Sequence, residues 1–188
     1  DCITKTSTVF KDNANIFGKV YFPRLIMPLS IVTSNLVRFG VQLIMLLFMM
    51  SYYAFIGADF EITYAIFFFP ILIVVMALLG LGLGLIITAM TTKYRDLKFL
   101  ISFGVQLLMY CSAVMYPLSY FKGRLPEYSW LVEYNPMTTI IELFRYMTLG
   151  VGSFSWKNLL YAGVISMAMF LMGLIIFNKT EKSFIDTV

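Results

Sequence analysis

Arg38 is the full charge that lies deepest inside a long apolar run of this sequence. An ionised side chain within lipid is costly, so such residues often line a route for polar cargo. A tilted helix, or an arginine stem that stretches toward the lipid headgroups, would also bring the guanidinium near water. Both interpretations stay open, and Arg38 is a candidate for lining a translocation path.

Glu142 and Arg145 are a second charged group, and their spacing places them on one face of a helix. Asn135 is suited to cap the start of that helix, with a proline at its first position and Gly150 at its end. A helix of about 14 residues is too short to cross a bilayer. We therefore expect residues 121–150 to form a re-entrant or interfacial helical element at the outer side, with Glu142 and Arg145 paired.

Aromatic residues make up 17% of the chain, and many gather between residues 110 and 134. Their faces can stack on sugar rings, which makes Tyr116, Tyr120 and Trp130 candidates for contact with a glycan. An aromatic belt at the membrane–water interface explains most of the cluster and is the favoured interpretation. The full set of candidates for a translocation path is Arg38, Tyr116, Tyr120, Trp130, Glu142 and Arg145.

Glycine alternates with leucine between Leu79 and Leu85. A phosphate-binding loop would need a strand, a lysine and polar surroundings, none of which this run has. Gly80 and Gly84 are four residues apart, with Thr88 one turn later, and this spacing is typical of helices that pack closely in lipid. We assign Gly80 and Gly84 to helix packing. Since the sequence has no GxxxxGK[ST] motif, any ATPase must lie on another chain or domain.

Few side chains here could support catalysis or metal binding. The 188 residues include no histidine, which excludes Ser-His-Asp triads and zinc sites built on histidine. Cys2 and Cys111 are expected to be free thiols. We predict no catalytic residue, no metal ligand and no cofactor bound by this chain. A membrane-embedded glycosyl or acyl transferase, which would need carboxylates or a histidine facing a cavity, remains an alternative of a different class.

The elements that position these residues are predicted to be membrane helices. Hydrophobic residues make up 60% of the chain and charged residues 13%, against about half and about a quarter in soluble domains. A hydrocarbon core about 30 Å thick needs about 20 helical residues. Four apolar stretches reach that length, at residues 25–56, 64–90, 99–118 and 159–177. The predicted fold is an all-α membrane protein with a single transmembrane domain over residues 1–188.

Lysine and arginine in the short connections predict the orientation of this domain. They are frequent in residues 1–24, 91–98 and 178–188, whereas the connections on the other side mix them with acids. The first side should be cytoplasmic, so that residues 1–24 form a cytoplasmic segment and residues 178–188 a cytoplasmic tail. The net charge of +4 does not indicate nucleic-acid binding, because the basic residues flank apolar runs.

Five short stretches occur in a distinctive order along the chain: residues 13–29 (NANIFGKVYFPRLIMPL), 93–97 (KYRDL), 116–117 (YP), 134–137 (YNPM) with Glu142 and Arg145, and 181–186 (EKSFID). As a set, they are specific. On these motifs the sequence resembles the permease subunit of type-2 ABC exporters for polysaccharides and polyol phosphates, a family that includes O-antigen, capsule and teichoic-acid exporters.

The resemblance implies a complete permease with six membrane spans, of which this N-terminally truncated chain would hold the last four. It implies that residues 121–150 are a helical pair near the outer face. It also places one cytoplasmic segment in a coupling helix that docks on a nucleotide-binding subunit. The residues of that segment are Lys19, Val20, Tyr21, Phe22, Pro23 and Arg24.

The resemblance also implies partners and a location. Two permease copies, a homodimer, would form a heterotetramer with two nucleotide-binding ATPase subunits, which would carry the ATP and Mg. A lipid-linked polysaccharide or polyol-phosphate polymer would pass between the two permeases, across the bacterial cytoplasmic (inner) membrane and among its lipids. A type-2 ABC exporter of drugs or lipids is the alternative within the same class.

Overall fold

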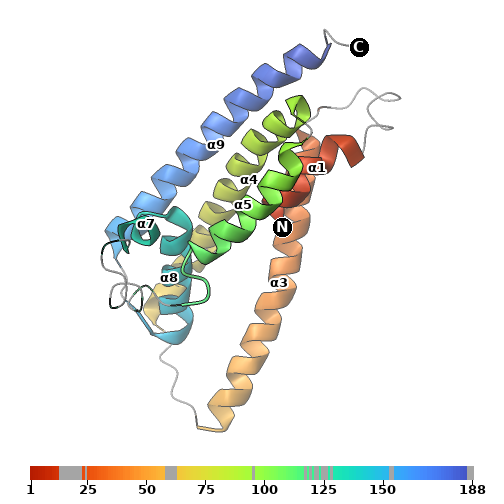
Figure 1. Cartoon of the computed structure of the whole chain (residues 1–188). Coiled ribbons are helices and arrows are strands. Elements are labelled where there is room, and N and C mark those ends of the chain that lie inside the picture. Colours follow the sequence, from red (N-terminus) through yellow and green to blue (C-terminus); the bar gives the residue numbers. More distant parts are fainter. Residues whose placement is uncertain are drawn as a thin grey trace.

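The structure, a computed structural model, describes residues 1–12, 23, 25–57, 63–94, 96–116, 118, 120, 123, 127, 129–152 and 155–185. The elements of these ranges are α1 (Cys2–Asp12), α3 (Ile26–Phe55), the 3-10 helix η1 (Tyr64–Phe68), α4 (Phe69–Lys93), α5 (Leu97–Tyr110), α7 (Ser129–Glu133), α8 (Pro136–Leu149) and α9 (Trp156–Ile185) (Figure 1). The all-α class predicted from the sequence is confirmed.

Three helical stretches among the described residues are long and apolar enough to cross a membrane. They are Ile26–Phe55, Tyr64–Thr91 and Trp156–Thr180, at the positions expected for spans 25–56, 64–90 and 159–177. Helix α9 continues beyond the expected span at both ends.

The fourth expected span, 99–118, is not one continuous helix in the structure. Helix α5 ends at Tyr110, and its 14 residues rise about 21 Å, against a hydrocarbon core of about 30 Å. The backbone then turns between Cys111 and Tyr116, where Ala113 has a φ of 51°, in the left-handed region. Hydropathy counts the apolar residues of this turn as helix, so it overestimates the length of the span.

Helix α4 lies at the centre of the bundle and packs against α9 along much of its length. Their backbones touch where Gly82 faces Gly173. A Cβ atom added to Gly82 would lie 2.6 Å from the carbonyl carbon of Met169, and one added to Gly173 would lie 2.5 Å from the carbonyl oxygen of Gly82. Glycine allows this approach because no side chain separates the two helices.

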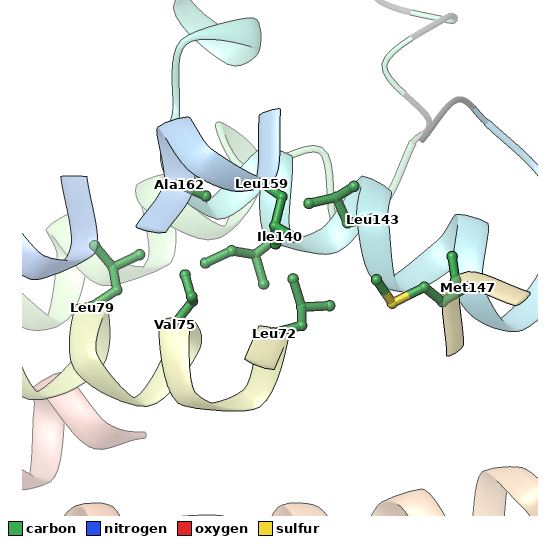
Figure 2. Packing of buried hydrophobic residues seen from close by; sticks show 9 residues of the cluster. Leu72, Val75, Leu79, Ile140, Leu143, Met147, Leu159 and Ala162 are labelled. Atoms are coloured by element: carbon green, nitrogen blue, oxygen red, sulfur yellow. The ribbon is translucent and has the colours of Figure 1, made fainter. Parts of the chain in front are cut away.

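A second group of contacts joins α4 and α9 to α8. Apolar side chains from all three helices form the largest buried cluster, part of which is shown in Figure 2. Its labelled members are Leu72, Val75, Leu79, Ile140, Leu143, Met147, Leu159 and Ala162. Helix α8 is thereby fixed to the two long helices by one of its faces.

Helix α1 packs on the second half of α4. The expectation of a cytoplasmic segment over residues 1–24 did not include this contact. Thr6 is fully buried, and Val9 is almost so. Two threonines of α4 bond to backbone carbonyls of α1: Oγ1 of Thr88 donates to the carbonyl of Thr6 and Oγ1 of Thr91 to that of Ser7, each at 2.9 Å. Residues 2–12 are therefore part of the helical bundle.

Helix α3 has few contacts with the rest of the molecule. Its buried residues, Pro28 and Val32, both lie near its start. Val32 packs in a small cluster with Leu81 and Leu85 of α4 and Phe177 of α9. Beyond these turns α3 diverges from the bundle, as Figure 1 shows, and its long apolar side chains are exposed.

Candidate functional site

The predicted helix after Asn135 is present as α8, with both of its expected ends. Oδ1 of Asn135 accepts a hydrogen bond from the backbone N–H of Met137 at 3.0 Å, which caps the start of the helix. Gly150 ends it with a φ of 69°, in the left-handed region that glycine enters without strain. The helix has 14 residues and does not qualify as a span.

The ion pair expected on α8 is also present. Nη1 of Arg145 lies 2.7 Å from Oε1 of Glu142, and both side chains are about one-fifth exposed. The same Oε1 atom accepts a hydrogen bond from the backbone N–H of Leu118 at 3.0 Å. Glu142 therefore connects α8 to the chain that follows α5.

Asn135 makes a second connection of the same kind. While its Oδ1 caps α8, its Nδ2 lies 3.2 Å from both the carbonyl oxygen of Cys111 and Oγ of Ser112. Ser112 is buried at the point where α5 ends. One amide side chain thus joins the start of α8 to the end of α5.

The aromatic candidates lie close to these connections. The rings of Tyr116 and Tyr120 stack, with 5.2 Å between their centroids and 17° between their planes, and both are exposed. Trp130 on α7 is exposed as well. Tyr134 follows α7, and its carbonyl accepts a hydrogen bond from the hydroxyl of Tyr161 in α9. Exposed aromatic faces at this end of the bundle could lie against a sugar, a lipid headgroup or water.

Arg38 lies apart from this group, on α3. Its Nη1 is 3.4 Å from Oδ2 of Asp1, and both side chains are more than half exposed. Ser34 and Gln42, one turn before and after Arg38, are exposed too and lie on the same side of α3. The structure therefore brings Tyr116, Tyr120, Glu142 and Arg145 together around α8, whereas Arg38 belongs to a separate polar row.

The assigned packing residues Gly80 and Gly84 both face α1. A Cβ atom on Gly80 would lie 3.6 Å from Cβ of Cys2, and one on Gly84 would lie 2.7 Å from Oγ1 of Thr6. The contact between Gly82 and Gly173, which is closer, was not predicted from the sequence. The alternation of glycine and leucine between Leu79 and Leu85 could have indicated Gly82, because it places glycines on more than one face of the helix, but it gives no sign of Gly173.

An apolar cavity of about 150 Å³ was not predicted from the sequence. It lies between α3, α4 and α8, and its lining side chains are all apolar. Three of the lining residues are phenylalanines, and the ring centroid of Phe69 lies 6.5 Å from that of Phe39 and 5.7 Å from that of Phe144. Such a lining suits hydrocarbon and offers no partner to an ion or a sugar.

Most of the expected coupling residues lie outside the part of the chain that the structure describes. Of the expected coupling residues, Pro23 is described and exposed, while Lys19, Val20, Tyr21, Phe22 and Arg24 lie outside the described residues. Within the part of the chain that the structure describes, no three histidine, cysteine or acidic residues are grouped closely enough to hold a metal ion.

Residues 2–149, most of the chain, match the family model of the ABC-2 type transporter. The chain belongs to this family. As an ABC-2 transporter membrane domain with several apolar helices, it is a multi-pass protein of the inner membrane.

Several relatives of this chain are named as O-antigen export system permeases. The O-antigen export system permease protein RfbA of Klebsiella pneumoniae is 27% identical over 179 residues, which are 94% of this chain and 65% of that protein. The protein of the same name from Myxococcus xanthus is 26% identical over 140 residues, 74% of this chain and 51% of that protein. The chain therefore spans just under two thirds of the length of the Klebsiella pneumoniae relatives.

Proposed function

We propose that this chain is the main membrane part of a permease that exports an O-antigen-type polysaccharide on a lipid carrier. The observation that carries the proposal is the similarity to O-antigen export permeases across 94% of the chain, within the ABC-2 family. The exposed aromatic residues around α8 are compatible with a glycan cargo, since their faces can stack on sugar rings.

In the proposed orientation, the α8 end of the bundle faces outward. The end of α4, the start of α5 and the end of α9 lie toward the opposite end of the bundle (Figure 1). Lys93, Lys98 and Lys179 belong to these helix ends. Lysine and arginine favour the cytoplasmic side of membrane proteins, which supports this orientation. The acidic Glu142 and the aromatic pair would then lie near the outer surface.

ATP hydrolysis would drive export from a separate nucleotide-binding subunit, which would bind ATP and Mg. Two permeases and two such subunits would form the transporter, and the polymer would pass between the permeases. The residues from Lys19 to Arg24 would dock on the ATPase, and their motion would reach the bundle through α1 and α3, the helices on either side of them. Helix α1 is bonded to α4 through Thr88 and Thr91, which provides one mechanical route.

Deletion of the permease gene in its own bacterium tests the proposal. We expect unexported glycan to accumulate inside the cell, and expression of the full-length permease with its ATPase to restore surface glycan. Normal surface glycan in the deletion strain, with altered resistance to drugs, would instead indicate a drug exporter. Turnover of a lipid-linked sugar by the purified full-length permease without an ATPase would indicate a transferase.

The assignment of the coupling segment has a separate test. Co-expression of the full-length permease with its ATPase should give a complex that survives in detergent. Replacing Tyr21, Phe22 and Arg24 with alanine should abolish that complex, while replacing the exposed Tyr52 and Tyr53 of α3 should leave it intact. A complex that tolerates the first set of changes would contradict the coupling assignment.

A further inference from the structure

We propose that Glu142 and Asn135 are positioning residues: they hold Cys111, Ser112 and Leu118, in the stretch that follows α5, against α8 and so fix the place of the Tyr116–Tyr120 pair. The contact itself is independent of what the protein transports. Its consequence for export rests on the proposed function.

Helix α5, which leads into this stretch, is a weak anchor. None of its residues is buried, and Phe99 and Phe103 are 81% and 60% exposed. In lipid, apolar side chains gain little from leaving the hydrocarbon, so exposed phenylalanines do not fix the helix to the bundle. The position of the chain after Tyr110 must therefore depend on other contacts.

Helix α8 is a strong anchor by comparison. Ile140, Leu143 and Met147 are 3%, 1% and 0% exposed and pack into the cluster with α4 and α9. Figure 2 shows these three side chains among those of the long helices. Whatever is bonded to the polar side of α8 is thereby held to the centre of the molecule.

Two polar side chains of α8 and its cap bond to the chain after α5. Glu142 accepts from the backbone N–H of Leu118, midway between the stacked tyrosines, and Asn135 donates to Cys111 and Ser112 at the end of α5. Arg145 lies against the same oxygen of Glu142 that accepts from Leu118, so it orients the carboxylate. Hydrogen bonds to charged groups contribute more than neutral ones, and more again where water is scarce.

Through these hydrogen bonds, the position of the Tyr116–Tyr120 pair depends on α8 and not on α5. Loss of the Glu142 carboxylate would leave the N–H of Leu118 without this acceptor and would let the tyrosines leave their place. The bundle would stay intact, because the apolar face of α8 is unchanged.

A cysteine probe at position 118 tests the contact in the full-length permease bound to its ATPase. Leu118→Cys keeps the backbone N–H that bonds to Glu142, and Cys2→Ser with Cys111→Ser removes the two cysteines of this chain. The rate of reaction with a membrane-impermeant maleimide should rise about tenfold in Glu142→Ala, because one hydrogen bond to a charged group is lost. Glu142→Gln keeps an acceptor oxygen and should give a smaller rise. The exposed Glu127→Ala is the matched control and should change nothing.

Export supplies the second measurement. In Glu142→Ala we expect surface glycan to fall while the complex elutes as before and its ATPase activity persists, with partial recovery in Glu142→Gln. An unchanged maleimide rate in Glu142→Ala would overturn the contact. A raised rate with unchanged export would overturn the positioning role. A wild-type permease that exports no glycan would refute the proposed function but would leave the maleimide result valid.

Discussion

Helices α3 and α4 are both long and apolar, yet they differ in how much of each is buried. In the most apolar part of α3, 6% of the residues are buried, against 44% in the most apolar part of Tyr64–Thr91, which covers η1 and most of α4. Helix α3 has bulky side chains and one glycine, Gly40, with nothing near the place of a Cβ atom. Helix α4 has three glycines in alternate positions and two threonines that bond to α1.

This difference shows which residues assemble a bundle in lipid. Hydrocarbon solvates a leucine or phenylalanine as well as a protein interior does, so apolar character alone does not bring helices together. Close backbone approach and hydrogen bonds between helices do so instead. On this view, substitutions in α4 should destabilise the bundle, and equivalent substitutions in α3 should have little effect.

The largest effect is expected for Gly82→Ala. The new methyl group would meet backbone atoms of Met169 and Phe170, which cannot rotate away as a side chain can. We expect the free energy of unfolding, measured by denaturant titration in bicelles, to fall by about 3 kcal/mol. Gly40→Ala in α3 is the matched control and should stay within about 0.5 kcal/mol. A similar loss in both variants would remove the distinction between the helices.

Leu85→Ala should have the next largest effect. Leu85 is fully buried between α3, α4 and α9, so its truncation leaves a cavity. We expect a loss of about 2 kcal/mol in the same titration, less than in many soluble proteins because lipid offsets the transfer term. Phe48→Ala removes a larger side chain from α3, but Phe48 is 73% exposed and its loss should be almost neutral.

Gly84→Ala tests the face of α4 that packs on α1. Its methyl group would lie 2.7 Å from Oγ1 of Thr6, a side-chain atom that can shift in part. We expect a loss of about 1 kcal/mol. Thr6→Ala removes the clashing atom, so the double variant should recover most of that loss, and a double-mutant cycle measures the coupling. Additive losses would show that the two residues do not touch.

The smallest effect is expected for Thr88→Val, which removes the hydrogen bond to α1. Bonds between membrane helices contribute about 0.6 kcal/mol on average, and we expect a loss of that size. Thr33 of α3 is the control, since its hydroxyl donates to Leu29 in its own helix and Thr33→Val breaks no contact between helices. A loss in Thr33→Val as large as that in Thr88→Val would contradict the role assigned to the interhelical bond.

Local chemistry explains which features could be predicted from the sequence. Caps act within a few residues, so Asn135 and Gly150 indicated both ends of α8. The pair of Glu142 and Arg145 depends on helical spacing alone. The lengths of apolar runs indicated three of the long helices, but not the turn after Tyr110, where the residues stay apolar while the backbone changes direction.

Features that depend on distant residues could not be predicted. The polar start of the chain resembles a solvated segment, and Thr6 is buried only because Gly84 and Thr88 face it. The hydrogen bond from Leu118 to Glu142 is donated by a backbone N–H, which every residue except proline has, so the residue type at position 118 does not indicate it. The role of Gly173 is evident only from its contact with Gly82, which lies on another helix.

Asn135 caps α8 through its side-chain oxygen and donates to Cys111 through its side-chain nitrogen, and the residue after it protects this amide from deamidation. Asparagine ages in proteins by deamidation, in which the next backbone nitrogen attacks the side-chain carbonyl and closes an imide ring. Residue 136 is proline, whose nitrogen has no hydrogen to lose, so this reaction is blocked. An aspartate at position 135 would still accept from Met137 but could not donate to Cys111. The order Asn-Pro therefore protects the link between α5 and α8 from deamidation by this route.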